Sequence, residues 1–184
     1  LLFSYGVKEG EINQELIAQN LIENKNKTLP EVFIIESLSK YDTDEKKDGK
    51  KLYDLLRLSG KKPKYFYINN KNELKGILEL FKESKYRFLH ISCHASLDTI
   101  SLTDEDLKYS EFTELCKGKF NQHRIFFSAC DLGNELFVNM LGTMNKGQLH
   151  SIIAPKEPLK FHHAAAIWST FYLYNIEKTL NMNS

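Results

Sequence analysis

Two stretches of the sequence decide its fold, Phe88-Leu-His-Ile-Ser-Cys-His-Ala95 and Arg124-Ile-Phe-Phe-Ser-Ala-Cys130. Each begins with a short run of aromatic and β-branched residues, which is typical of a strand buried on both faces of a parallel sheet. Each then ends in small and reactive residues. We therefore predict strands at residues 88–92 and 124–128, with their reactive ends at the carboxyl edge of one sheet.

Further strands and helices are predicted on both sides of these stretches. Apolar runs of β-favouring residues indicate strands at residues 32–35, 65–68 and 151–154. Apolar positions at helical spacing indicate helices at residues 11–24, 52–58, 73–82, 109–116, 135–141 and 164–174. Asn72 is expected to cap the helix at 73–82. The charged segment 40–51 is expected to be a solvated loop.

This alternation predicts an α/β fold, a three-layer sandwich in which helices flank a mainly parallel central sheet. Residues 1–30 are interpreted as an N-terminal helix and linker, and residues 31–184 as one compact domain, because the chain is long enough for one core but marginal for two. Leu1 stands where a complete chain would have methionine, which suggests a segment of a longer polypeptide.

The composition is that of a globular protein. Hydrophobic residues make up 42% and charged residues 27%, and the formal net charge is only +1. Neither nucleic acid nor a membrane is therefore expected as a partner. The longest apolar run, residues 164–174, is shorter than the roughly 20 residues that cross a bilayer. The three cysteines show no disulfide spacing, which favours a reducing, cytoplasmic location.

Two reactive side chains follow the ends of the two central strands. His94 comes after the strand at 88–92, and Cys130 after the strand at 124–128. Catalytic groups gather at the carboxyl ends of strands in open α/β sheets, and a thiol just before a helix is favoured as the thiolate. If the two strands are neighbours, about 4.8 Å apart, His94 can act as the base for Cys130.

Other readings of the same residues are less favoured. The two-residue period of a strand separates Cys93 from His94, so Cys93 is expected to be a buried core thiol and His90 a hydrogen-bonded structural histidine. A zinc site is the rival reading, but CxxC and HExxH patterns are missing from the sequence, and we expect no metal. Ligand types for such a site would come from His90, Cys93, His94, His162 and His163.

These motifs resemble those of the caspase-like cysteine peptidases of clan CD, and within them the CHAT-domain branch, which includes relatives of separases. Proteins of this type carry a strand that ends in a His-Gly pair, here His94-Ala95, and a later strand that ends in Ser-Ala-Cys, here Ser128-Ala-Cys130. The likeness extends to a small hairpin at 99–104 and covers roughly residues 31 to 178. A caspase-like fold is what this resemblance implies.

The resemblance implies a cysteine endopeptidase without a cofactor, in which Cys130 attacks the substrate and His94 manages the protons. The backbone N–H groups of Cys130 and Ala95 would form the oxyanion hole, although the family has glycine at the second position. A protein substrate and a regulatory domain or partner protein are expected, with Asp131 and His162 in the loops that contact the substrate. Asp131 would favour a basic side chain in the substrate or, equally, cap the helix that follows. An inactive interaction or scaffold domain of the same fold is the alternative.

Overall fold

The apolar runs of the sequence form the strands of a mainly parallel sheet. The computed structural model describes residues 2–4, 28–120, 122–145 and 149–181. Within them the main path of the sheet runs in the order β1 (Leu2–Ser4), β8 (Ser151–Pro155), β7 (Arg124–Ser128), β4 (Tyr86–Ala95), β2 (Leu29–Ser37) and β3 (Lys64–Tyr67). Neighbouring strands are parallel except for β1 with β8. An antiparallel hairpin of β5 (Thr99–Ser101) and β6 (Asp106–Lys108) continues from β4.

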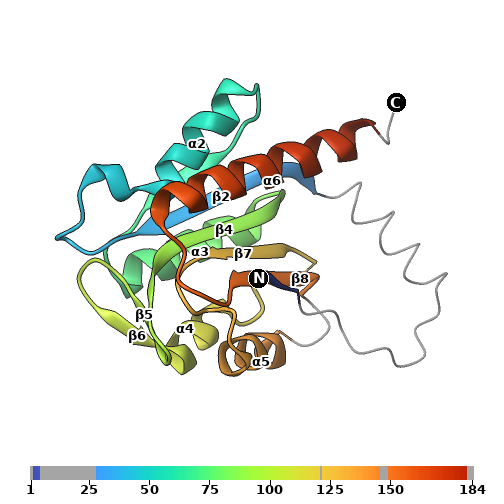
Figure 1. Cartoon of the computed structure of the whole chain (residues 1–184). Helices are drawn as coiled ribbons and strands as arrows, with labels where there is room; N and C mark the ends of the chain where they lie inside the picture. Colours follow the sequence, from blue (N-terminus) through green and yellow to red (C-terminus); the bar gives the residue numbers. More distant parts are fainter. Residues whose placement is uncertain (1, 5–27, 121, 146–148, 182–184) are drawn as a thin grey trace, which may run out of the picture.

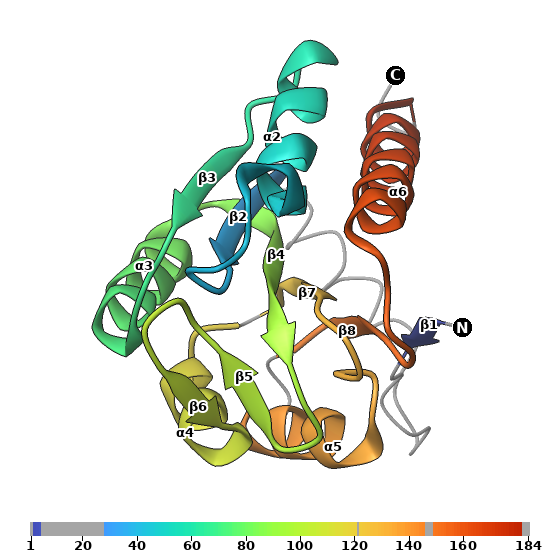
Figure 2. The same cartoon turned by 60° about the vertical axis from the view of Figure 1, so that its left-hand side comes forward.

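Helices cover both faces of the sheet (Figures 1 and 2). One face carries α3 (Lys71–Glu83), α4 (Tyr109–Cys116) and α5 (Glu135–Met144), and the other carries α2 (Asp48–Leu58) and α6 (Phe161–Asn181). Strand alternation divides the core between them: Phe33 and Ile35 pack with α3, α4 and α5, whereas Val32 and Ile34 pack with α2 and α6. The predicted three-layer α/β sandwich is confirmed.

The predicted elements are present with small changes at their ends. The helix expected at 109–116 has those bounds as α4, and the strand expected at 88–92 is longer, so that β4 includes His94. Asn70 caps α3, because its side chain accepts hydrogen bonds from the amides of Asn72 and Glu73, so the prediction that Asn72 is the cap is wrong. The helix predicted at 11–24 lies outside the described residues.

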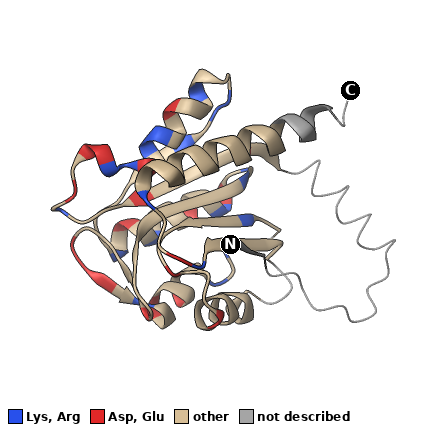
Figure 3. Cartoon of the chain, viewed as in Figure 1, with Lys and Arg blue, Asp and Glu red and all other residues tan. Residues whose placement is uncertain are grey.

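The charged segment 40–51 is only in part the solvated loop that we predicted, because residues 43–46 are exposed but Asp48 and Gly49 are buried. Acidic and basic residues follow one another along it (Figure 3), yet it contains the short 3-10 helix η1 (Asp44–Lys46) and the start of α2. Asp48 is only 2% exposed. The prediction failed because the carboxylate of Asp48 is hydrogen-bonded to residues on distant strands, and the local sequence does not show these partners.

α6 contains the predicted core helix at 164–174. Trp168 and Tyr172 are buried against the sheet together with Phe88 and Phe126. In the part of the chain that the structure describes, no helix combines the length and the apolar character that spanning a membrane requires.

The turn between Cys130 and α5 packs tightly against the end of β8. The amide of Gly133 donates a hydrogen bond to the carbonyl oxygen of Pro155 at 2.7 Å. A Cβ atom at position 133 would lie 2.7 Å from the same oxygen. Because the two backbones approach so closely, this position requires glycine.

Gly133→Ala is therefore expected to lower the free energy of unfolding by about 1–3 kcal/mol, since the added methyl group forces the turn away from β8. Urea denaturation measures the change. Gly142→Ala in α5 is the control, because nothing lies within 4 Å of the Cβ it would add, and it should raise stability by about 0.5–1 kcal/mol. Equal stability of the two variants would contradict the close approach.

Candidate active site

The pairing of β4 with β7 brings the two sequence-predicted residues to the same level. The strands are adjacent and parallel, and their ladder ends with Ser92 opposite Ser128. His94 and Cys130 each follow their serine by two residues, and parallel neighbours are about 4.8 Å apart. The condition on which we predicted the pair, that these two strands are neighbours, is thus met.

A carboxylate that the sequence analysis missed contacts His94. Oδ2 of Asp42 lies 2.6 Å from Nε2 of His94, and Oδ1 accepts a hydrogen bond from Nζ of Lys46 at 2.7 Å. Burial by itself would raise the pKa of Asp42, but the bonds from Lys46 and His94 outweigh it, so its pKa lies below the usual value. A carboxylate at this distance favours the proton on Nε2 and leaves Nδ1 as the basic nitrogen.

Asp42 follows the carboxyl end of β2, which is the neighbour of β4. That position was the available signal in the sequence, because loops after adjacent parallel strands meet at one edge of the sheet. We missed it because Asp42 stands in the charged segment 40–51, whose composition resembles that of a solvated surface.

Burial distinguishes Cys130 from the other thiols. All three cysteines are free; Cys130 is half-buried, whereas Cys93 and Cys116 are buried. Burial raises the pKa of both buried thiols above the usual value, so they stay protonated and unreactive. Cys93 belongs to the core on the α3 side of the sheet, which confirms that it is a core thiol.

His90 is a structural histidine, as predicted. It is fully buried, its Nδ1 lies 3.1 Å from the hydroxyl of Tyr172, and burial lowers its pKa to about 3. Among the described residues, no cluster of three or more histidine, cysteine or acidic side chains is arranged to hold a metal ion. Of the zinc ligand types considered from the sequence, Cys93 and His90 point to opposite faces of β4.

The backbone groups expected for the oxyanion hole lie at the two strand ends. Ala95 is the last residue of β4, opposite Ile100 of the hairpin. In the described ranges the non-glycine residues with positive φ are Gln122 and Asp131, so Ala95 has a backbone conformation in which alanine replaces glycine without strain.

Asp131 does not cap α5, so that interpretation of the residue is wrong. The cap is Asn134, whose Oδ1 accepts a hydrogen bond from the amide of Phe137 at 2.9 Å. Asp131 is half-buried in the left-handed conformation, with φ of 59°, in the turn directly after Cys130. Asp131 therefore directly follows the candidate nucleophile in sequence, and its role in substrate contact stays a prediction.

A chain of hydrogen bonds joins the turns that follow the two candidate residues. Asn134 donates to the hydroxyl of Tyr109 at 3.0 Å, and this hydroxyl donates to the carbonyl oxygen of Ser96 at 2.6 Å. Asn134 also donates to the carbonyl oxygen of Asp131 at 2.7 Å. The turn after β4 and the turn after β7 are therefore held relative to each other by α4.

The first turn of α6 forms one wall of the site. The ring of Phe161 meets the ring of His94 edge to face, with centroids 5.7 Å apart. Lys46 lies over the same Phe161 ring at 5.9 Å from its centroid. His162, which was expected to contact the substrate, is the next residue along α6 and is exposed. The aromatic contact to His94 is thus made by Phe161.

A buried carboxylate bridges the two strands directly beneath the candidate pair. Asp48, the first residue of α2, accepts hydrogen bonds from the hydroxyls of Ser92 and Ser128, the second at 2.5 Å. Burial raises the pKa of Asp48 above the usual value, and the two serine bonds oppose that rise. The bridge therefore links α2, β4 and β7 at positions that are two residues before His94 and Cys130.

A second buried carboxylate holds the start of α2. Glu36 of β2 is fully buried and accepts hydrogen bonds from the amides of Gly49 and Lys50, at 2.8 and 3.1 Å, and from the hydroxyl of Tyr65 at 2.7 Å. Burial dominates over these bonds and raises the pKa of Glu36 to about 7.

Comparison with known proteins assigns no family to the chain. Neither a family model nor a curated protein matches the sequence. The candidate site therefore rests on the geometry given above and on the resemblance of its two motifs.

Glu36 makes the stability of the fold depend on pH. Its folded-state pKa of about 7 exceeds the usual 4.5, so the unfolded chain releases this proton at lower pH than the folded chain. Stability from this group is full below pH 4.5 and is lost as the pH rises toward 7. Between pH 5 and pH 8, the free energy of unfolding of the parent should fall by about 2–3 kcal/mol more than that of Glu36→Gln. Urea denaturation at each pH measures both.

Glu83→Gln is the control for this comparison, because Glu83 is exposed at the end of α3. It should follow the pH curve of the parent. Parallel curves for the parent and Glu36→Gln would show that Glu36 ionises alike in the folded and unfolded chains.

Proposed function

We propose that this chain is a cysteine endopeptidase domain that acts on a protein substrate, with Cys130 as nucleophile and His94 as its proton acceptor and donor. One observation carries the proposal: neighbouring strands present an accessible thiol and a carboxylate-bound imidazole at the same level of one sheet edge. Covalent acyl transfer requires a nucleophile, a base that can take its proton and a group that orients the base.

In this mechanism the thiolate sulfur of Cys130 attacks the scissile carbonyl carbon and forms a C–S bond. The amide N–H groups of Cys130 and Ala95 stabilise the oxyanion. His94 then gives its proton to the departing amine, and an acyl-enzyme remains. Water then attacks this thioester while His94 accepts a proton from it, so that the carboxylic acid is released and the thiolate of Cys130 and the imidazolium of His94 are restored.

Asp42 acts through His94. By accepting a hydrogen bond from the Nε2–H group, it keeps the ring in one tautomer and one orientation, and it stabilises the imidazolium that forms when Nδ1 takes a proton. The ring of Phe161 also contacts the His94 ring edge to face. His94 is therefore held ready for proton transfer before substrate arrives.

Substrate selection is assigned to the loops around the two strand ends. Asp131 would favour a basic side chain in the substrate, and the exposed His162 would contact the chain on either side of the cleaved bond. The free cysteines fit a reducing, cytoplasmic setting. In that setting, a regulatory domain or partner protein would control access to the site.

A biotinylated peptide chloromethyl ketone tests the proposal on the full chain. We expect it to label Cys130 at neutral pH, with loss of labelling in Cys130→Ala and a rate about 100-fold or more lower in His94→Ala. Cys116→Ala is the matched control and should be labelled like the parent, because Cys116 is fully buried. Mass spectrometry of the labelled peptide identifies the residue.

Labelling of Cys93 in place of Cys130 would refute the catalytic assignment. A Cys130 that reacts no faster in the folded chain than in the urea-unfolded chain would instead support the alternative, an inactive interaction or scaffold domain of the same fold.

The role of Asp42 is tested separately in the same assay. Asp42→Asn should slow labelling of Cys130 by about tenfold or more, because the amide also stabilises the wrong tautomer of His94. Asp44→Asn lies two residues away and removes the same charge from an exposed side chain paired with Lys47, so it should leave the rate unchanged. Equal rates for both variants would exclude an orienting role for Asp42.

A further inference from the structure

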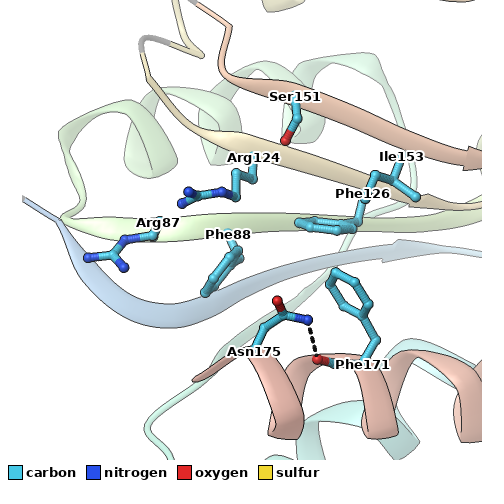
Figure 4. A pocket seen from close by; sticks show the side chains of 8 residues that line it. All are labelled: Arg87, Phe88, Arg124, Phe126, Ser151, Ile153, Phe171 and Asn175. Carbon is cyan, nitrogen blue, oxygen red and sulfur yellow. Dashed lines mark hydrogen bonds between the residues drawn. The ribbon is translucent and has the colours of Figure 1, made fainter. Parts of the chain in front are cut away.

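A cavity of about 190 Å³ lies between the first residues of β4, β7 and β8 and the later turns of α6 (Figure 4). It is at the amino ends of these strands, whereas His94 and Cys130 stand at the carboxyl ends of β4 and β7. Its lining consists of Arg87, Phe88, Arg124, Phe126, Ser151, Ile153, Phe171 and Asn175. None of these residues takes part in the candidate active site.

Strand register explains why this cavity has an apolar floor and one charged end. Phe88, Arg124 and Ser151 stand opposite one another at the starts of β4, β7 and β8, so their side chains share one face. Phe126 stands one step further along β7, and Phe171 of α6 packs on it with ring centroids 5.2 Å apart. Figure 4 shows these aromatic rings beside the arginine side chains.

The charged end is formed by Arg124, which has no counter-ion among the described residues. The guanidinium of Arg124 lies over the ring of Phe88, 5.8 Å from its centroid, and its Nη2 is 3.2 Å from Nε2 of His150. Across the described ranges, no carboxylate forms an ion pair with Arg124. A partly buried cation without an anion is unfavourable, so this arrangement favours an anionic ligand.

Two further basic residues lie beside this end of the cavity. Burial, and then the charges of Arg124 and Arg87, lower the pKa of His150 to about 4, so it is neutral and can accept a hydrogen bond from Arg124. Arg87 is fixed by hydrogen bonds to the hydroxyl and carbonyl oxygens of Thr28, both at 3.0 Å.

We propose that this cavity binds a small planar ligand that carries a phosphate or carboxylate group. The planar guanidinium of Arg124 matches the paired oxygens of such an anion, and the aromatic walls match an apolar ring. The cavity is smaller than the 300 Å³ or more that is usual for drug-sized ligands, so the ligand has about the size of one substituted ring.

Phenyl phosphate is the probe, titrated into the full chain by calorimetry at pH 7.5 and low salt. We expect saturable one-to-one binding that is weaker for inorganic phosphate and not measurable for phenol. Arg124→Gln should raise the Kd for phenyl phosphate about tenfold or more. Arg57→Gln removes the same charge from an exposed side chain of α2 and should leave the Kd unchanged.

A second pair of variants does not depend on removing the arginine. Ser151 stands opposite Arg124 in the β7–β8 ladder, so Ser151→Asp places a carboxylate beside the guanidinium. This variant should lose phenyl phosphate binding and gain thermal stability, whereas Ser151→Asn should keep the Kd of the parent. Absence of saturable binding to the parent, or an unchanged Kd in Ser151→Asp, would overturn the proposal.

Discussion

A single buried carboxylate connects the parts of this molecule on which the candidate active site depends. Asp48 begins α2, and its two oxygens accept hydrogen bonds from serines on both central strands. A carboxylate removed from water is unfavourable by itself, and the two hydroxyls compensate for the lost solvent. Glu36 in turn fixes the amides that follow Asp48. The position of the helix and the alignment of the strand ends are therefore mutually dependent.

Much of this architecture could be predicted from local sequence. A strand buried on both faces must be apolar throughout, so residues 88–92 and 124–128 could be identified without a partner. α4 could also be predicted from local sequence, because its apolar positions recur with the period of a helix. Both candidate residues, His94 and Cys130, could be found because reactive side chains at the carboxyl ends of parallel strands share one edge of the sheet.

The remainder could not be predicted because it depends on partners far away in the sequence. Asp48 and Ser128 are 80 positions apart, and before folding Asp48 is one charged residue among several. Asp42 contacts His94 only because the loop after β2 reaches the next strand in the folded chain. Asn134 and not Asp131 caps α5, and this choice depends on the tight turn in which Gly133 packs against β8.

α6 belongs to both regions of interest. Its first residue, Phe161, contacts the ring of His94, and Phe171, ten positions later, lines the cavity at the amino ends of the strands. At about 1.5 Å per residue these points are about 15 Å apart along one continuous helical rod. Because one helix contributes to both regions, an axial displacement of α6 would change the contacts of His94 and the lining of the cavity together.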